Sequence, residues 1–165
     1  MISITKVGVE SIPVIKDQAQ ITWAVAYASI LSPGQMQYML HLFYSENSLQ
    51  KQMQDGHQFI IAYHADIPVG FASYSPKNTD HPKVYRLHKL YINPDQQGKG
   101  IGKLLLNFII NEIKHRSATD LELNVNRNNK ALHFYLNAGF VIIAEEDIDI
   151  GNDYFMNDYV LGMEV

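Results

Sequence analysis

The chain has 165 residues and a formal net charge of -4, a size that favours a single domain spanning residues 1–165. Its 47% apolar and 11% aromatic residues are enough to build a core without covalent cross-links. The absence of cysteine excludes disulfides, thiolate-bound metals and a cysteine nucleophile. No segment approaches the roughly 20 apolar residues that span a bilayer, and the first residues do not match a signal peptide, so we expect a soluble, cytoplasmic protein with no membrane partner.

The spacing of apolar residues switches between helical and strand-like along the chain. In chain order it predicts a strand at 2–9, helices at 15–30, 33–44 and 47–55, strands at 58–63, 68–74 and 84–92, a helix at 101–116, a strand at 121–125, a helix at 128–137, and strands at 140–147 and 154–163. Ser32 followed by Gln35 is typical of a capping box, and Asn47 is the expected cap of the third helix. The pattern is that of a mixed α/β domain.

Gly98, Gly100 and Gly102 stand at alternate positions between a predicted strand and a predicted helix. Such glycines leave backbone N–H groups uncovered, and the helix N-terminus adds unpaired donors, so the segment is typical of a phosphate-binding loop. It is not a dinucleotide fingerprint, because Lys103 stands at the last glycine position, and not a P-loop, because Leu104 follows that lysine. The alternative is a tight turn, for which one glycine would suffice.

Two segments resemble the GNAT superfamily of acetyl-CoA-dependent N-acetyltransferases. Gln97, Gly100 and Gly102 match the family's Gln/Arg-x-x-Gly-x-Gly/Ala loop, and residues 128–140 are similar to its Asn-x-x-Ala-x-x-x-Tyr-x-x-x-Gly-Phe pattern. The order of predicted elements fits over residues 2–163. The resemblance implies a GNAT-like mixed, mostly antiparallel sheet of about seven strands, splayed between its fourth and fifth strands and flanked by about four or five helices.

The same resemblance implies acetyl-CoA as the cosubstrate and assigns residues to it. It implies that the backbone of Leu90, Tyr91 and Ile92 binds the pantetheine arm and that Tyr135 protonates the departing thiolate. The residues expected to hold the cofactor are Leu90, Tyr91, Ile92, Gln97, Gly98, Lys99, Gly100, Ile101, Gly102, Lys103 and Asn128. From the sequence alone, a core aromatic is the alternative for Tyr135 and a helix cap is the alternative for Asn128.

The acceptor amine must lose a proton, because an ammonium with an ordinary pKa of about 10.4 has no lone pair at neutral pH. His88 is the candidate base, since it lies on the strand before the glycine loop and its ordinary pKa suits proton removal near pH 7. Glu122 is a weaker candidate, and the alternatives are a merely structural histidine and a chain of water molecules. The other histidines have no metal-ligand spacing, so we expect no metal.

Charge is unevenly distributed along the chain. Residues 77–130 carry ten Lys/Arg and five Asp/Glu, whereas residues 131–165 carry seven Asp/Glu and no Lys or Arg. The basic stretch coincides with the expected cofactor segment, and the net acidic chain argues against a nucleic-acid partner. The acidic stretch, which includes Asp158, could attract a cationic amine; the alternative is a solvated surface. The Asp158-Tyr159 ending is similar to that of polyamine-type members of the family.

The sequence thus predicts an N-acetyltransferase that moves an acetyl group from acetyl-CoA to a primary amine, with a small amine or polyamine favoured. Direct transfer in a ternary complex is expected, because no cysteine can carry the acyl group. The alternatives are a protein or peptide N-acetyltransferase and a non-catalytic acyl-CoA sensor that would not need Tyr135. A homodimer is compatible with the resemblance, but the sequence identifies no interface.

Overall fold

The computed structural model describes all 165 residues and contains one seven-stranded sheet in the order β1-β2-β3-β4-β5-β7-β6. The strands are β1 (Ile2–Val7), β2 (Gln58–His64), β3 (Ile67–Pro76), β4 (Val84–Ile92), β5 (Asp120–Asn126), β6 (Val141–Gly151) and β7 (Tyr154–Glu164). The helices are α1 (Ile12–Ala26), α2 (Pro33–Tyr44), α3 (Glu46–Gln54), α4 (Ile101–Lys114) and α5 (Ala131–Asn137), with short 3-10 turns η1 (Val9–Ser11) and η2 (Pro94–Gln96). None of these helices combines the length and apolarity needed to cross a membrane. Only β4 and β5 pair in parallel, which confirms the mixed, mostly antiparallel sheet.

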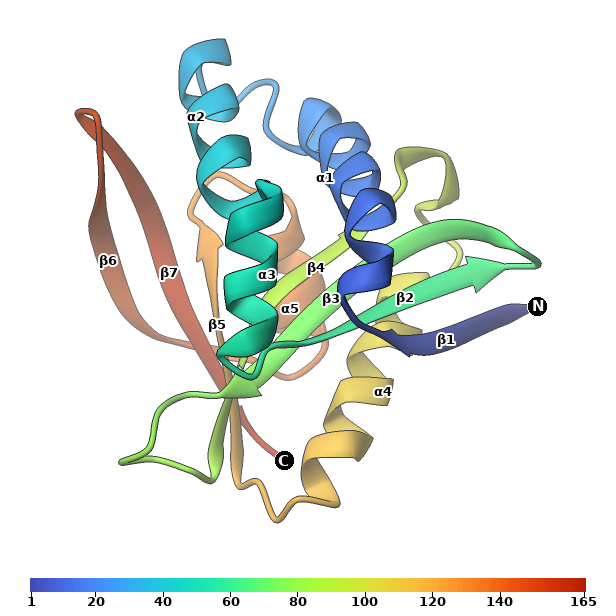
Figure 1. Ribbon diagram of the computed structural model, residues 1–165. Coiled ribbons are helices and arrows are strands. Elements are labelled where there is room, and N and C mark those ends of the chain that lie inside the picture. The colour runs from blue at the N-terminus through green and yellow to red at the C-terminus, as the bar shows by residue number, and fades with distance from the viewer.

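Helices cover both faces of the sheet (Figure 1). Successive side chains of a strand point to opposite faces, so Phe59 and Ile61 of β2 pack with α1–α3, whereas Ile60 and Ala62 pack with α4 and α5. Strands buried on both faces need continuous apolar runs, and the central strands β2 and β3 have them. The sheet is therefore the middle layer of three.

The sheet opens between its two parallel strands. β4 pairs with β5 only from Val84 to Leu87, opposite Asp120 to Leu123, and beyond that point the two strands separate. β5 stays paired with β7 along its whole length, so the separation leaves one side of β4 without a strand partner. The splay expected between the fourth and fifth strands is confirmed.

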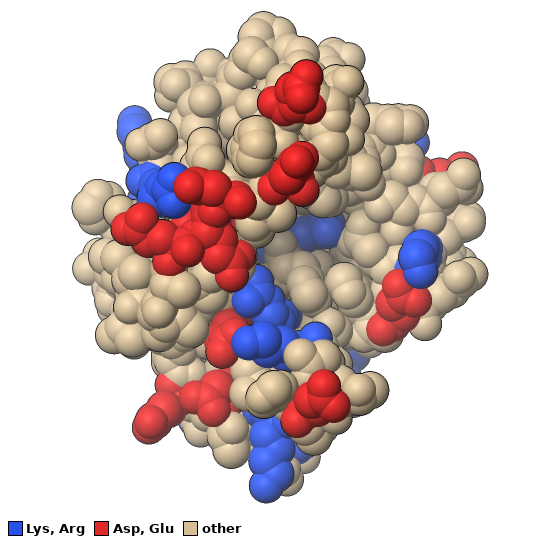
Figure 2. Space-filling view, turned by 90° about the vertical axis from the view of Figure 1, so that its left-hand side faces the viewer, with Lys and Arg blue, Asp and Glu red and all other residues tan.

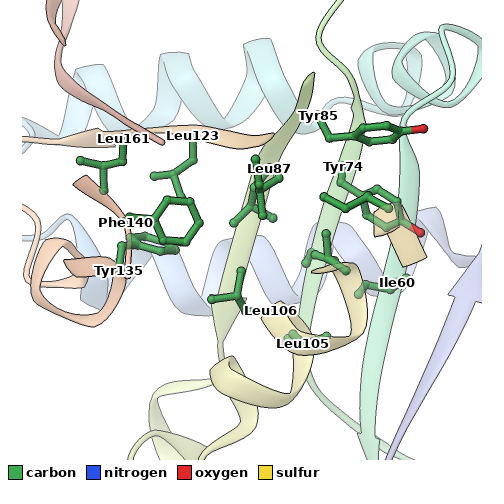
Figure 3. Packing of buried hydrophobic residues seen from close by; sticks show 14 of the residues in the cluster. Ile60, Tyr74, Tyr85, Leu87, Leu105, Leu106, Leu123, Tyr135, Phe140 and Leu161 are labelled. Atoms are coloured by element: carbon green, nitrogen blue, oxygen red, sulfur yellow. The ribbon is translucent and has the colours of Figure 1, made fainter. Parts of the chain in front are cut away.

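The side chains beneath the opening form part of the larger apolar cluster. Figure 3 shows Tyr135 of α5 beside Phe140, with Leu123 and Leu161 of the neighbouring strands close by. The ring centroids of Tyr135 and Phe140 lie 5.6 Å apart at an interplanar angle of 79°, an edge-to-face arrangement. This packing fixes the short helix α5 and the tyrosine that it carries.

Two helix caps differ from the expected ones. Ser32 does cap α2, accepting a hydrogen bond from the backbone of Gln35 at 3.1 Å, but the Gln35 side chain donates to the Phe155 carbonyl instead of completing a capping box. Ser45, not Asn47, caps α3, because its hydroxyl accepts from the Ser48 backbone N–H at 3.2 Å. Serine and asparagine are equally good caps, so the sequence pattern did not separate these two positions.

Several element boundaries also differ from the expected ones. The helix expected at 15–30 spans Ile12–Ala26, and the strand expected at 2–9 ends at Val7. The short helix expected from residue 128 begins at Ala131, because the Asn129 side chain accepts from the Ala131 backbone at 2.9 Å and forms a turn first. β6 extends to Gly151, past its expected end, and joins β7 through a two-residue turn in which Asn152 and Asp153 have φ of 56° and 60°. Positive φ at both central residues is the geometry of the tightest hairpins, which lets this acidic, solvent-exposed strand stay paired.

Candidate functional site

A cavity of about 1000 Å³ lies where β4 and β5 separate. Its lining includes the glycine loop at the start of α4, the second half of β4, and Tyr135 of α5. Residues of α1, α2, α3, β5, the loop after β5 and the β6–β7 hairpin also line it. Figure 2 shows a hollow on one face of the molecule, with Lys and Arg side chains inside it and Asp and Glu side chains along one rim. The expected cofactor loop and the expected catalytic tyrosine therefore share one cavity.

The glycines of the loop serve two different purposes. Gly98 and Gly100 both have φ of 79°, and a Cβ on either would meet nothing within 4 Å, so backbone conformation and not space requires glycine there. Gly102 lies inside α4, and a Cβ on it would come within 3.3 Å of the Phe134 ring. The third glycine is therefore explained by close packing of α4 against α5.

The free edge of β4 faces the cavity. Leu90, Tyr91 and Ile92 all line it, and they lie beyond the last residue that pairs with β5. A strand edge without a partner presents unpaired N–H and C=O groups at alternating positions. Gln97 uses one of them, since its side-chain amide donates to the Ile92 carbonyl at 3.4 Å. The remaining edge is available to an extended ligand with amide groups of its own.

Other residues expected to hold the cofactor differ in what they can contribute. Lys103 and Asn128 line the cavity. Ile101 lines it as well, but its side chain is buried in the core, so only its backbone is available. Lys99 lies outside the cavity, with its ammonium donating to the Gln96 side chain at 3.1 Å.

Tyr135 is buried at the cavity wall, and its hydroxyl makes no hydrogen bond to the protein. Burial, and secondarily the nearby Tyr27, raises the pKa of Tyr135 above its ordinary value. The phenol therefore keeps its proton at neutral pH. A protonated hydroxyl with no protein partner, facing a cavity, is free to donate to a ligand atom.

A β-bulge in β4 determines which side chains reach the other end of the cavity. Ser73 of β3 pairs with Lys89, but the next residue, Tyr74, pairs with Leu87, so His88 is an extra residue in the strand. A bulge lets two successive side chains point to the same face. His88 and Lys89 accordingly both contact residues on the α1–α3 side, whereas Leu87 packs on the α4 side.

His88 is held by two contacts. Its Nε2 lies 2.7 Å from the Ser75 hydroxyl, and its ring stacks on His57 with centroids 4.0 Å apart. The Ser75 hydroxyl also donates to the Pro76 carbonyl at 3.1 Å, so Nε2 carries the imidazole hydrogen and Nδ1 is the basic nitrogen. His88 keeps an exposed side toward the cavity, yet the cavity walls withdraw its ring from bulk water. This burial, followed by His57 and nearby cations, lowers the pKa of His88 well below its ordinary value, so the ring is neutral at pH 7.

The second candidate base, Glu122, is not brought into the site. It lies outside the cavity lining and pairs with Lys77 at 2.9 Å and Arg86 at 3.7 Å. Outside the cavity and held by two cations, its carboxylate is not placed to reach an acceptor amine. Glu122 therefore serves to compensate charge next to the cavity.

The acidic C-terminal stretch divides into two parts. Glu145 and Asp147 are exposed and pair with Arg127 at 3.9 and 2.6 Å, as a solvated surface would. Asp158 lines the cavity, is 3% exposed, and accepts a hydrogen bond from the Asn124 side chain at 3.2 Å. Burial raises the pKa of Asp158 above its ordinary value.

The sequence analysis did not name Lys89 or Arg86 as site residues, although both line the cavity, and it named Asp158 only as part of the acidic stretch that could attract a cationic amine. The sequence offered a signal for Asp158, because this acidic residue stands directly beside the apolar run of β7. In the structure it is the one buried carboxylate of that strand. Lys89 left no such signal, because the bulge that orients it depends on pairing with β3.

Comparisons with known proteins agree with this geometry. A family model described as the acetyltransferase (GNAT) domain matches residues 27–155. The L-amino acid N-acyltransferase MnaT of Escherichia coli (strain K12) is 30% identical over 95 residues, 54% of each chain. The peptidyl-lysine N-acetyltransferase YjaB of the same organism is 27% identical over 111 residues, 66% of this chain and 67% of that one. Matches to the curated relatives span about half of their length.

Among solved structures, the PaiA N-acetyltransferase from Thermoplasma acidophilum in complex with coenzyme A superposes with a TM-score of 0.83. The match covers 100% of this chain and 99% of that one at 24% identity, so it establishes a shared fold.

Proposed function

This chain belongs to the acetyltransferase (GNAT) family, and on that premise we propose that it is an acyltransferase that moves the acetyl group of acetyl-CoA directly to a primary amine. The observation that carries the proposal is the single cavity that joins the glycine loop, the free edge of β4 and Tyr135. No cysteine is present to carry the acyl group, so both substrates must occupy this cavity together.

We propose that the two ends of the cavity divide the substrates between them. The loop amides from Gly98 to Lys103, at the N-terminus of α4, suit the pyrophosphate, since unpaired helix donors and the helix dipole both favour an anion. The backbone of Leu90, Tyr91 and Ile92 suits the pantetheine amides, and Asn128 lines the same side. When bound there, acetyl-CoA supplies the thioester that is attacked.

In the proposed reaction the residues of this chain move two protons. His88 accepts, at Nδ1, the proton that the acceptor ammonium must lose. Because the pKa of His88 is lowered, this transfer runs uphill, and the ring must pass the proton on to solvent as the amine attacks. The amine nitrogen then bonds to the acetyl carbon, an unpaired N–H of β4 stabilises the charge that develops on the carbonyl oxygen, and the carbon–sulfur bond breaks. As the amide forms, its nitrogen gives up a second proton, and Tyr135 gives its own proton to the departing sulfur. The proton released by the nitrogen then restores the Tyr135 hydroxyl. Because the pKa of Tyr135 is raised, its proton moves to the sulfur only if the transfer accompanies cleavage of the carbon–sulfur bond. The Tyr135 hydroxyl must therefore lie next to the sulfur.

The favoured acceptor is a small primary amine. Residues of α1, α2 and the β6–β7 hairpin line the cavity together with the cofactor loop, which suits a small amine held between them. The relationship to YjaB keeps a peptidyl lysine as the second candidate. A non-catalytic sensor is disfavoured, because the Tyr135 hydroxyl lies at the cavity without a protein partner, as a proton donor to a ligand requires.

The proposal predicts that acetyl-CoA and a suitable amine together release free CoA. A thiol reagent can follow the release continuously, because the protein has no cysteine to react with it. A panel of amino acids, polyamines and lysine peptides covers the acceptor classes, and acetyl-CoA alone measures background hydrolysis. CoA binding without turnover on any amine would support the sensor instead.

His88→Gln is expected to lower kcat/KM by about 10²-fold if the imidazole is the base. Because the lowered pKa of His88 keeps the wild-type ring neutral, this loss should be the same from pH 6 to pH 9. Rate measurements on His88→Gln, Asp158→Asn and the exposed control His41→Gln across that range test the assignment. Asp158 is the rival, a buried carboxylate in the same cavity. A loss in Asp158→Asn together with full activity in His88→Gln would transfer the role to Asp158.

A further inference from the structure

Lys89 is a buried cation without a carboxylate partner. Its exposed fraction is 9%, and its ammonium donates to the Gln52 side chain at 2.8 Å. It also lies 5.1 Å from the centroid of the Tyr44 ring and 5.8 Å from that of Phe59. No Asp or Glu oxygen lies within 4.0 Å of the Lys89 ammonium, the limit for an ion pair. Burial lowers the pKa of Lys89 to about 8, so the amine remains mostly protonated at pH 7.

Such an arrangement is costly for a purely structural residue. Removing an ammonium from water is unfavourable unless an opposite charge compensates it, and one amide oxygen and two ring faces compensate it only in part. An apolar side chain of the same length would pack on Tyr44 and Phe59 without that penalty. The missing charge is therefore expected to come from a ligand in the cavity that Lys89 lines.

The neighbouring groups in the cavity are consistent with an anion at this position. His57 and His88 are stacked imidazoles, and burial lowers the pKa of both, so these neighbours are uncharged and do not compensate the charge of Lys89. Arg86, on the same strand, adds a second positive charge, only partly offset by Glu122, which Lys77 also holds. Figure 2 shows Lys and Arg side chains inside the hollow.

One carboxylate, Asp158 of β7, also lines the cavity. Asn124 donates a hydrogen bond to Asp158 and accepts one from Arg86. Asp158 is therefore linked to the arginine and forms no ion pair with Lys89. The cavity thus offers both a positive and a negative group. A zwitterion matches that pair, whereas a polycation would meet an uncompensated Lys89.

We propose that Lys89 binds a carboxylate of the acceptor, so that the substrate class is an amino acid with a free carboxylate, not a polyamine. The inference rests on the proposed acetyltransferase activity and specifies its substrate. In this arrangement Lys89 positions the acceptor and takes no part in proton transfer.

The test compares acceptors that differ only in the carboxylate. CoA release is measured with each of the twenty L-amino acids, with the carboxamide of each, and with spermidine. We expect the best amino acid to exceed its own carboxamide in kcat/KM by about tenfold or more, because a site built for a polar group rejects the analogue that lacks it. The amine of a carboxamide loses its proton more easily, so intrinsic reactivity alone would give the opposite order.

Lys89→Met keeps the length of the side chain and removes the charge. It should raise KM for the amino acid by about tenfold with kcat nearly unchanged, and should leave the carboxamide unaffected. Lys51→Met, on the exposed side of α3, is the matched control and should change neither. If Lys89→Met does not fold, the wild-type protein with CoA should be stabilised more by an N-acetyl amino acid than by its amide.

The outcomes separate the two proposals. Acetylation of spermidine or carboxamides as fast as amino acids would overturn the role of Lys89 and leave the acetyltransferase intact. An equal loss on both acceptor types in Lys89→Met would do the same. Absence of CoA release with every amine would overturn both.

Discussion

Replacing Tyr135 with phenylalanine is expected to lower kcat by about 10²- to 10³-fold while leaving the Kd for acetyl-CoA unchanged. The phenyl ring keeps the edge-to-face contact with Phe140 and removes only the proton that the departing thiolate needs. The hydroxyl makes no hydrogen bond to the protein, so its loss should not lower the melting temperature. Steady-state kinetics, calorimetric CoA binding and thermal unfolding measure the three quantities.

Tyr154→Phe is the matched control for this experiment. Tyr154 lies at the start of β7, outside the cavity lining, and removing its hydroxyl is expected to leave kcat unchanged. A Tyr135→Phe protein that retains wild-type turnover would refute the acid role. A large loss in both variants would point to a general effect on folding.

Gly100→Ala should weaken CoA binding by about tenfold or more, the second of the large effects we expect. Gly100 adopts a φ of 79° at the N-cap of α4, and an L-residue held in that region costs about 1–2 kcal/mol. If the loop relaxes to avoid this cost, its backbone N–H groups turn away from the position they share with the helix N-terminus. Titration calorimetry with CoA gives the change in Kd, and urea denaturation gives the change in the free energy of unfolding.

Gly56→Ala separates strain from binding. Gly56 also has a positive φ, 96°, and a Cβ on it would likewise meet nothing within 4 Å, but it follows α3 far from the loop. Both variants should lose a similar free energy of unfolding, and only Gly100→Ala should lose affinity for CoA. Equal CoA affinity in the two variants would contradict the proposed phosphate loop.

The order of elements and the cofactor side of the site were predictable from the sequence, for a physical reason. Apolar periodicity records which face of an element is buried, and the alternate glycines record a backbone conformation that few other residues adopt. Both are local properties of a short segment. The strands and the glycine loop at the start of α4 followed from them, whereas the splay between β4 and β5 was expected only from the resemblance to the GNAT family.

The acceptor side was less predictable because it depends on pairing between strands. The segment from Leu87 to Leu90 has two polar residues, His88 and Lys89, between two apolar ones. Strict alternation would place the two polar side chains on opposite faces of the sheet. The pairing with β3 shows that His88 is an extra residue, and only then do both polar side chains face the cavity. The cap of α3 shows the same limit, since Ser45 and Asn47 are both good caps.

In the proposed reaction, the bulge in β4 gives the two substrates different binding groups on the same strand. Beyond Leu87 the strand offers main-chain groups to one substrate and the side chains of His88 and Lys89 to the other. Main-chain donors do not depend on residue type, so we expect substitutions of Lys89 to change the accepted amine without altering cofactor affinity. A single strand can thus be retuned for new acceptors while its common donor is preserved.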